Sequence, residues 1–397
     1  MNSAIQEPRK REIKSFQIFT VLFWFSNYIV TPYITPQLQA MGVGNIVIGY
    51  VVSSYSIAQI LIRVPLGILS DRIGKRKLFI IIGSLLTLIS VSGLWLTQSV
   101  EWFFFFRTLQ GLAVTSWVCA TVLYAGYLRP DEAVRATVQL QVCNSGGTLA
   151  GYILGGAVAG KYGYQSVFLV AAIGALLAAA TSTRITEIQK KTEQARIGTL
   201  LRVGCSPFLL YVAGMAVFGQ ILLSSTIWGF TPQLATGLGG GATGVALCSM
   251  CFSTAGLLCA LFITVPVRKA LGERCTLVAA MALEAVFCIL QSRCSSLVLL
   301  YFCCFCTGIT HNMSYSMLLG MSIELFPEKV RAAAMGWHQA IYALGLFIGP
   351  VVAGYFSELY GLKAAFSAVG TIGLLGAVLA LLLYSRARCA TRHQHWD

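Results

Sequence analysis

Few side chains in this sequence could hold a proton or a fixed charge away from the ends of its long apolar segments. Glu284 is the one acidic residue of fourteen that lies in the middle of such a segment. An ionised side chain at that depth in a membrane costs roughly 2.5–3.5 kcal/mol or more, so burial favours the neutral carboxylic acid. Two interpretations stay open: Glu284 takes up and releases a proton as water access changes, or it is a neutral acid that hydrogen bonds to a neighbour.

Two arginines and two histidines are the other ionisable side chains inside apolar segments. Arg107 is deep enough that its charge only partly reaches water. Arg63 is less than two helical turns from the next loop, which favours extension to the membrane surface; binding an anionic ligand or pairing with Glu284 are the alternatives. His311 and His338 are each either hydrogen-bonded core residues or proton relays. Two buried arginines against one acid favour a neutral, zwitterionic or anionic ligand.

Twelve apolar stretches of about 17–26 residues must position these side chains. The chain is 57% hydrophobic and 11% charged, whereas a soluble domain carries roughly 25% charged residues. About 20 helical residues cross a ~30 Å hydrocarbon layer, and the period-two pattern of a membrane barrel is missing. We therefore expect an all-α integral membrane protein. The expected spans are 16–36, 46–69, 77–96, 102–126, 136–159, 164–183, 207–231, 243–265, 276–292, 297–321, 332–356 and 363–385.

The basic residues alternate between loops. Of 28 Lys and Arg, 23 fall in the two tails and in alternate loops, and only Lys161, Arg293 and Lys363 fall in the other loops. The positive-inside rule then places both termini in the cytoplasm, in agreement with an even number of spans. A nucleic-acid partner would need these charges on one surface, so the formal charge of +14 does not indicate one. The first span is too long for a signal peptide and is expected to stay in the protein.

The cysteines give no strong sign of a metal site. Cys248 and Cys251 form a CxxC pair, and Cys303, Cys304 and Cys306 form a group. All five fall in expected spans, where a free cysteine behaves as a small apolar residue. We predict no metal and no cofactor apart from a proton.

The chain consists of two similar halves. The sequence Thr35-Pro36-Gln37-Leu38 recurs as Thr231-Pro232-Gln233-Leu234, and Val134-Arg135-Ala136 recurs as Val330-Arg331-Ala332. Six spans per copy make the copies parallel, related by an axis along the membrane normal, and such halves bind substrate between them near the midplane. The expected organisation is a six-helix bundle over 1–183, a cytoplasmic linker over 184–206, a second bundle over 207–385 and a cytoplasmic tail over 386–397.

A polar loop follows the second span. Its glycines permit a tight turn and a close helix approach, and its aspartate could accept hydrogen bonds from the N-terminus of a neighbouring helix, such as the one near Arg331. The loop resembles the GxxxDRxGRR signature of the major facilitator superfamily. That resemblance implies a latch that closes the cytoplasmic side. The residues concerned are Gly67, Asp71, Arg72, Gly74, Lys75 and Arg76. The corresponding loop of the second half has Lys269 in place of the aspartate.

Two further patterns are similar to elements of the same family. Arg107-Thr108-Leu109-Gln110-Gly111 resembles its RxxQG element, which implies substrate or proton handling. A glycine pattern in span 5 resembles the antiporter element GxxxGPxxGG, but has Tyr152 in place of proline; small residues at this spacing also simply let helices approach closely. The pattern in span 5 comprises Gly147, Gly151, Gly155 and Gly156, and its counterpart in span 11 comprises Gly345, Gly349, Pro350 and Gly354.

The resemblance covers the whole chain and implies a twelve-span secondary transporter, similar to bacterial drug or metabolite:proton antiporters, rather than an enzyme. We expect it to export drug-like or metabolic compounds across a plasma membrane as a monomer among lipids; proton-coupled import of an organic anion or sugar-like nutrient is the alternative. Glu284 and Arg107 are the candidates for proton coupling. Spans 1, 4, 7 and 10 line the cavity in this family, so the expected cavity residues are Asn27, Arg107, Gln110, Gln220, Trp228, His311 and Asn312.

Overall fold

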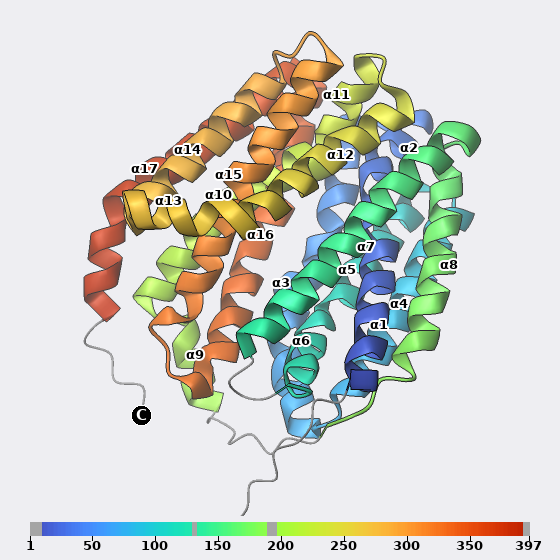
Figure 1. The fold of residues 1–397 in the computed structure, drawn as a ribbon. Helices are drawn as coiled ribbons and strands as arrows, with labels where there is room; N and C mark the ends of the chain where they lie inside the picture. Colours follow the sequence, from blue (N-terminus) through green and yellow to red (C-terminus); the bar gives the residue numbers. More distant parts are fainter. Residues whose placement is uncertain (1–9, 129–132, 189–196, 392–397) are drawn as a thin grey trace, which may run out of the picture.

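A computed structural model describes residues 10–128, 133–188 and 197–391, and these residues form helices joined by short loops, with no strand among them (Figure 1). Ten helical stretches in these ranges are long and apolar enough to cross a membrane. Two more helices, α7 (Ala133–Tyr162) and α14 (Glu273–Gln291), lie outside that set and pack along spanning neighbours. With them the bundle has twelve crossings.

The first half runs from α1 to α8 and the second from α10 to α17. In the first half the remaining elements are α1 (Lys10–Tyr28), η1 (Thr31–Tyr33), α2 (Ile34–Ala40), α3 (Asn45–Ile73), α4 (Arg76–Leu96), α5 (Val100–Thr115), α6 (Trp117–Ala125) and α8 (Tyr164–Ser182). The second half adds α10 (Pro207–Ser225), η3 (Thr226–Phe230), α11 (Thr231–Gly237), α12 (Gly241–Leu258), η4 (Cys259–Ile263), α13 (Thr264–Leu271), α15 (Leu297–Glu324), α16 (Glu328–Tyr360) and α17 (Leu362–Thr391).

Each expected span coincides with one of these helices or with consecutive pieces of one crossing. Pro32 lies in the 3₁₀ turn η1, which divides the first crossing. The turns η3 and η4 are π-helical and interrupt the seventh and eighth crossings. The expected linker over 184–206 contains a further helix, α9 (Ile197–Gly204), and its Lys190–Gln194 segment lies outside the described residues. Helix α17 continues into the expected tail as far as Thr391.

The described ends of the chain lie on one side of the bundle, which we call the terminal face; α2 and α11 lie on the opposite side, the far face (Figure 1). The two halves touch mainly along α3 and α16, and along α7 and α12. A Cβ at Gly49 would lie 2.3 Å from the carbonyl oxygen of Pro350, and one at Gly354 would lie 2.4 Å from that of Asn45. At these points backbone touches backbone, and only glycine fits.

Polar contacts also join the halves at the far face. The Glu358 carboxylate, at the end of α16, accepts a hydrogen bond of 2.5 Å from the backbone N–H of Asn45, the first residue of α3. The Asn45 amide group donates to the Ser357 hydroxyl at 2.9 Å. A carboxylate at a helix N-terminus is favoured by the helix dipole, so charge and packing both hold the far face closed in this conformation.

The predicted glycine pattern lies at helix contacts, most of them within one half, while Gly156 and Gly354 contact the other half. A Cβ at Gly147 would lie 2.3 Å from the carbonyl oxygen of Val21 in α1. In the second half, a Cβ at Gly345 would lie 2.2 Å from the carbonyl oxygen of Val217 in α10. The other glycines of the pattern are also close to neighbouring helices, and they are Gly151, Gly155, Gly156 and Gly349. Tight packing accounts for this pattern without any reference to the direction of transport.

Candidate functional site

A buried polar chain links α5 to α1. The Nη1 group of Arg107 donates to the side-chain oxygen of Gln110 at 2.6 Å. The Gln110 amide group in turn donates to the backbone oxygen of Asn27 at 3.2 Å and to its side-chain oxygen at 3.3 Å. All three residues are almost fully buried. Three of the expected cavity residues therefore form one connected unit, in which Gln110 and Asn27 hold the guanidinium in place.

Arg107 also faces an aromatic ring of the neighbouring helix α3. Its guanidinium carbon lies 4.5 Å from the centre of the Tyr55 ring, which is a cation–π distance. The glycine of the RxxQG element makes this possible, because a Cβ at Gly111 would lie 1.8 Å from the Tyr55 carbonyl oxygen. The element thus supplies a cation, the amide that orients it and the small residue that lets the two helices meet.

Arg63 does not reach the membrane surface, in contrast to the interpretation favoured from the sequence. It is 4% exposed, and its Nη1 group donates to the Tyr342 hydroxyl of α16 at 3.5 Å. It does not pair with Glu284 either. The partner of Arg63 belongs to the other half of the chain, so its short distance to the loop along the sequence is no guide to its direction. Within the described ranges neither Arg63 nor Arg107 forms an ion pair with a carboxylate.

Aromatic side chains surround the two arginines where the halves meet. The rings of Tyr28 and Trp228, from opposite halves, lie 5.9 Å apart. The rings of Tyr315 and Tyr342 lie 6.1 Å apart, edge to face. We call this group the seam cluster, and its members are Tyr28, Tyr55, Arg63, Arg107, Tyr152, Trp228, Tyr315 and Tyr342.

Local backbone features position two members of the cluster. Trp228 lies on the π-helical turn η3, where the wider turn interrupts the regular α-helix. Tyr152 is the residue that replaces the proline of the antiporter element, and it lies on α7, which packs along α12 of the other half. Its ring lies edge-on to Tyr28 at 6.5 Å. The replacement therefore puts a polar aromatic group at the contact between the halves.

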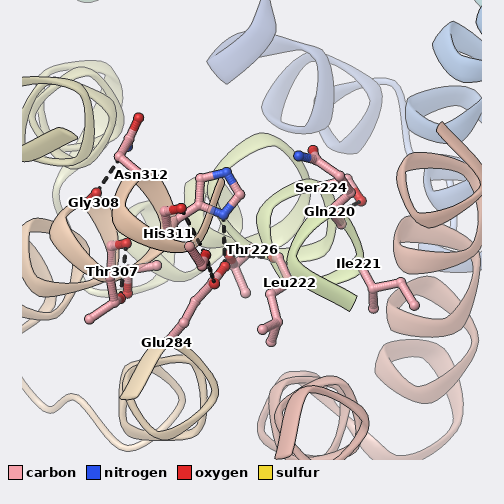
Figure 2. Close-up of polar contacts among 12 residues, drawn as sticks. Gln220, Ile221, Leu222, Ser224, Thr226, Glu284, Thr307, Gly308, His311 and Asn312 are labelled. Carbon is pink, nitrogen blue, oxygen red and sulfur yellow. Dashed lines mark hydrogen bonds and ion pairs between the residues drawn. The ribbon is translucent and has the colours of Figure 1, made fainter. Parts of the chain in front are cut away.

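A second polar group lies inside the C-terminal half. Nδ1 of His311 in α15 lies 2.8 Å from Oε1 of Glu284 in α14. The Ser314 hydroxyl donates to the other carboxylate oxygen at 3.4 Å. Glu284 has no exposed surface, and His311 is 5% exposed. Figure 2 shows one ring nitrogen of His311 directed at Glu284 and the other directed away from it. The sequence indicated both residues separately but not their contact.

The remaining expected cavity residues are placed differently. Asn312 donates to the Gly308 carbonyl of its own helix at 2.9 Å and packs on Gly256 of α12, where a Cβ would lie 2.1 Å from its amide nitrogen. The backbone carbonyl of Gln220 accepts a hydrogen bond from the Ser224 hydroxyl, and Gln220 lies apart from the Glu284–His311 pair in Figure 2. His338 is fully buried, and its ring lies 5.6 Å from that of Tyr342. Asn312 therefore joins α15 to α12.

The loop after α3 is described in part. Gly74 ends α3 with a φ of +68°, a conformation that favours glycine. Gly67 makes only ordinary contact, since its Cβ would lie 3.8 Å from Val118, so the close approach expected there is missing. Arg72 and Lys75 are exposed, and Arg76 is half-buried. The side chain of Asp71 lies outside what the structure describes, so the latch is still a prediction.

Sequence reasoning did not single out four tyrosines of the seam cluster, namely Tyr55, Tyr152, Tyr315 and Tyr342. Each lies in an apolar helix where an aromatic residue is expected in the core, and nothing in the local pattern distinguishes it. Within the residues described, no group of three or more His, Cys, Asp or Glu could hold a metal. A separate pocket of about 340 Å³ lies between α13 and α15, lined by Thr264, Val265, Arg268, Lys269, Ser316, Met317 and Gly320.

Comparison with known proteins gives consistent matches. The family model described as Major Facilitator Superfamily matches residues 18–228 and 213–394. The chain is 23% identical over 375 residues to the multi-drug resistance efflux pump PmrA of Streptococcus pneumoniae, which covers 87% of this chain and 90% of the relative. A D-xylose–proton symporter has a similar fold, with a TM-score of 0.79 at 14% identity over 95% of this chain and 98% of its own. So does a bacterial homologue of the human lysosomal transporter Spinster in an inward-facing, unoccupied conformation, with a TM-score of 0.72 at 15% identity over 98% of both chains.

Proposed function

The chain belongs to the Major Facilitator Superfamily, as a multi-pass membrane transporter, and we propose that it exports aromatic drug-like or metabolic compounds in exchange for protons. The seam cluster is the observation that supports this proposal. It combines flat aromatic surfaces from both halves with two buried arginines that lack a carboxylate partner in the described ranges. Such a site favours planar neutral, zwitterionic or anionic compounds, because rings stack on the tyrosines and an anion neutralises an arginine.

The same residues suit a transport cycle in which each half moves as a unit. Substrate contacts from both halves would change when the halves rock, so binding and opening would depend on each other. We assign the terminal face to the cytoplasm of a plasma membrane because the basic loops lie on that side. The conformation described here, with its far face closed, is then the inward-facing state. A single copy supplies both halves of the site, which agrees with a monomer.

Relatives named as efflux pumps support the proposed direction of transport, which can be tested in cells. Cells that express the protein are loaded with a panel of fluorescent aromatic compounds: neutral, zwitterionic, anionic and cationic. Lower accumulation of neutral, zwitterionic or anionic members, reversed by an uncoupler that collapses the proton gradient, is the expected result. Cells expressing Arg107→Gln at equal protein levels are the matched control and should accumulate more compound than cells with the unmodified protein.

Three outcomes would contradict this proposal. Higher accumulation of an anionic member would identify an importer, in which Arg107 and Arg63 bind the incoming anion. Lower accumulation confined to cationic members would contradict the role given to the two arginines, because buried guanidinium groups repel a cation. An unchanged level for every member would reject export of aromatic compounds.

A further inference from the structure

We propose that Glu284 and His311 together form the proton-carrying site of this transporter. The proposal rests on the proton-coupled transport proposed above and adds the group that binds the proton. Its basis is geometric: an imidazole nitrogen lies 2.8 Å from a carboxylate oxygen, and both side chains are almost completely buried between helices of one half. The pair does not belong to the seam cluster, but it is connected to that cluster through Tyr315.

The carboxylate has no direct route to water. Glu284 has no exposed surface, and both of its oxygens accept hydrogen bonds from α15, from His311 and from Ser314. His311 keeps a small exposed fraction, and the ring nitrogen that does not face Glu284 has no hydrogen-bond partner among the described residues. A proton therefore reaches Glu284 through the imidazole: it binds Nε2 from water, and the Nδ1 proton passes to Oε1.

Charge balance explains why one proton matters. A neutral imidazole beside an ionised carboxylate leaves the pair with one negative charge, and one added proton makes the pair neutral. A net charge in a water-excluded helix bundle is costly, whereas a neutral hydrogen-bonded pair is tolerated. A sealed half therefore favours the neutral pair, and entry of water lowers the cost of the charged pair.

The surroundings of the pair supply no fixed compensating charge. On α10, a Cβ at Gly219 would lie 3.9 Å from the carboxylate, and on α12 the Phe252 ring lies 5.7 Å from the imidazole ring. On α17, Gly370 and Gly373 face α14. The titratable neighbours are the thiol of Cys288 on α14 and the hydroxyl of Tyr315 on α15. No Lys, Arg, Asp or Glu of the described chain forms an ion pair with Glu284 or His311.

A continuous series of contacts leads from the pair to the substrate site. The centres of the His311 and Tyr315 rings lie 6.0 Å apart, and the ring planes are 12° from parallel, so the rings are stacked. The rings of Tyr315 and Tyr342 lie 6.1 Å apart, and the Tyr342 hydroxyl accepts a hydrogen bond from Arg63 at 3.5 Å. A change of charge on the imidazole therefore acts on residues that would contact the substrate. This connection gives the pair a way to link proton binding to substrate binding.

A purely structural role is the competing explanation, since the pair joins α14 to α15. The chain contains a matched control. Gln291 of α14 donates to the Thr307 hydroxyl of α15 at 3.1 Å and accepts from Thr231 at 2.8 Å, and it is also fully buried. This bridge joins the same two helices without a titratable group. Loss of helix contact and loss of a proton site can therefore be separated by comparing the two bridges.

The first experiment needs no substrate. The infrared difference spectrum between acidic and alkaline samples of the full chain in detergent should contain a carbonyl band of a buried protonated carboxyl group. That band should be lost in Glu284→Gln, shifted in His311→Gln and unchanged in Gln291→Leu. A band that survives in Glu284→Gln, or is missing from the unmodified protein, would overturn the proposal. This readout stands even if no transported compound is found.

The second experiment uses proteoliposomes and ciprofloxacin, a fluorescent aromatic zwitterion. Glu284→Gln should abolish transport driven by a pH gradient and preserve exchange of labelled for unlabelled compound, while Glu284→Asp should restore part of the gradient-driven transport. If Glu284→Gln loses both gradient-driven transport and exchange, and Gln291→Leu does the same, the pair has a structural role. Retention of both activities in Glu284→Gln would also refute the proposal. If the unmodified protein exchanges no ciprofloxacin, the function proposed above fails for this compound, and the infrared band alone decides whether the pair binds a proton.

Discussion

The contact between Glu358 and the first turn of α3 predicts that one exposed carboxylate influences which face of the transporter is open. Glu358 and Asn45 belong to different halves, and their hydrogen bond can exist only while the far face is closed. Replacing Glu358 by alanine should therefore destabilise the closed far face and leave each half intact.

The magnitude follows from the position of the carboxylate. Loss of a hydrogen-bonded cap at a helix N-terminus costs about 0.5–2 kcal/mol. Glu358 is exposed, so water can partly replace it, and about 1 kcal/mol is the appropriate value. That free energy changes the ratio of open to closed molecules by about fivefold. The Asn45–Ser357 hydrogen bond and the backbone contacts at Gly49 and Gly354 stay in place, so closure should be weakened and not abolished.

Spin labels at Ala40 and Gly237, the exposed last residues of α2 and α11 in opposite halves, would measure this ratio as the populations of long and short distances. The background is a cysteine-free version that still transports. Glu101→Ala is the matched control, because Glu101 is an exposed far-face carboxylate that accepts a hydrogen bond from Ser99 at the start of its own helix. Equal distance distributions for Glu358→Ala and the unmodified protein, or the same change in Glu101→Ala, would refute the reasoning.

Three other predictions concern stability and substrate binding. Gly111→Ala should lower the stability of the purified protein by about 1–3 kcal/mol in thermal unfolding, because the new methyl group would meet the Tyr55 carbonyl. Gly146→Ala is the control: a Cβ there has open space around it, so this variant should be more stable than the unmodified protein by about 1 kcal/mol. Arg107→Gln should weaken binding of anionic or zwitterionic substrates by roughly 10–100-fold, because a buried charge-assisted contact contributes about 1.5–3 kcal/mol. Arg107→Lys keeps the charge, so its affinity should lie between those of Arg107→Gln and the unmodified protein. Equal KM values for the two variants would show that the charge is not used. Asp71→Asn should cripple transport in proteoliposomes with near-normal expression, and unchanged turnover would remove the predicted latch.

Much of the fold could be predicted because membrane insertion is encoded locally. Apolar length alone sets the spans, and each predicted range coincides with a helix or a divided crossing. The glycine pattern pointed to helix contacts for the same reason, since only small residues allow backbones to approach so closely. Breaks inside crossings were harder to foresee: the π-helical turn at Thr226–Phe230 contains no proline, and its sequence resembles the helix on either side.

The candidate site depends on contacts that are distant along the chain. Glu284 and His311 stood out because each is polar in an apolar segment, but their contact requires α14 and α15 to present matching faces. Arg63 was misjudged because its partner, Tyr342, is 279 residues away. A local pattern cannot show which tyrosine of an apolar helix will face the opposite half.

The glycine contacts between α3 and α16 also bear on how well the protein keeps ions from crossing the membrane. A barrier made of side chains is porous on short timescales, because rotamers change in picoseconds to nanoseconds. Here the barrier at Gly49 and Gly354 is main chain against main chain, which no rotamer change can open. Passive leak of protons through the far face should therefore be as rare as movement of the whole half, and a cell could express this protein without dissipating its membrane potential.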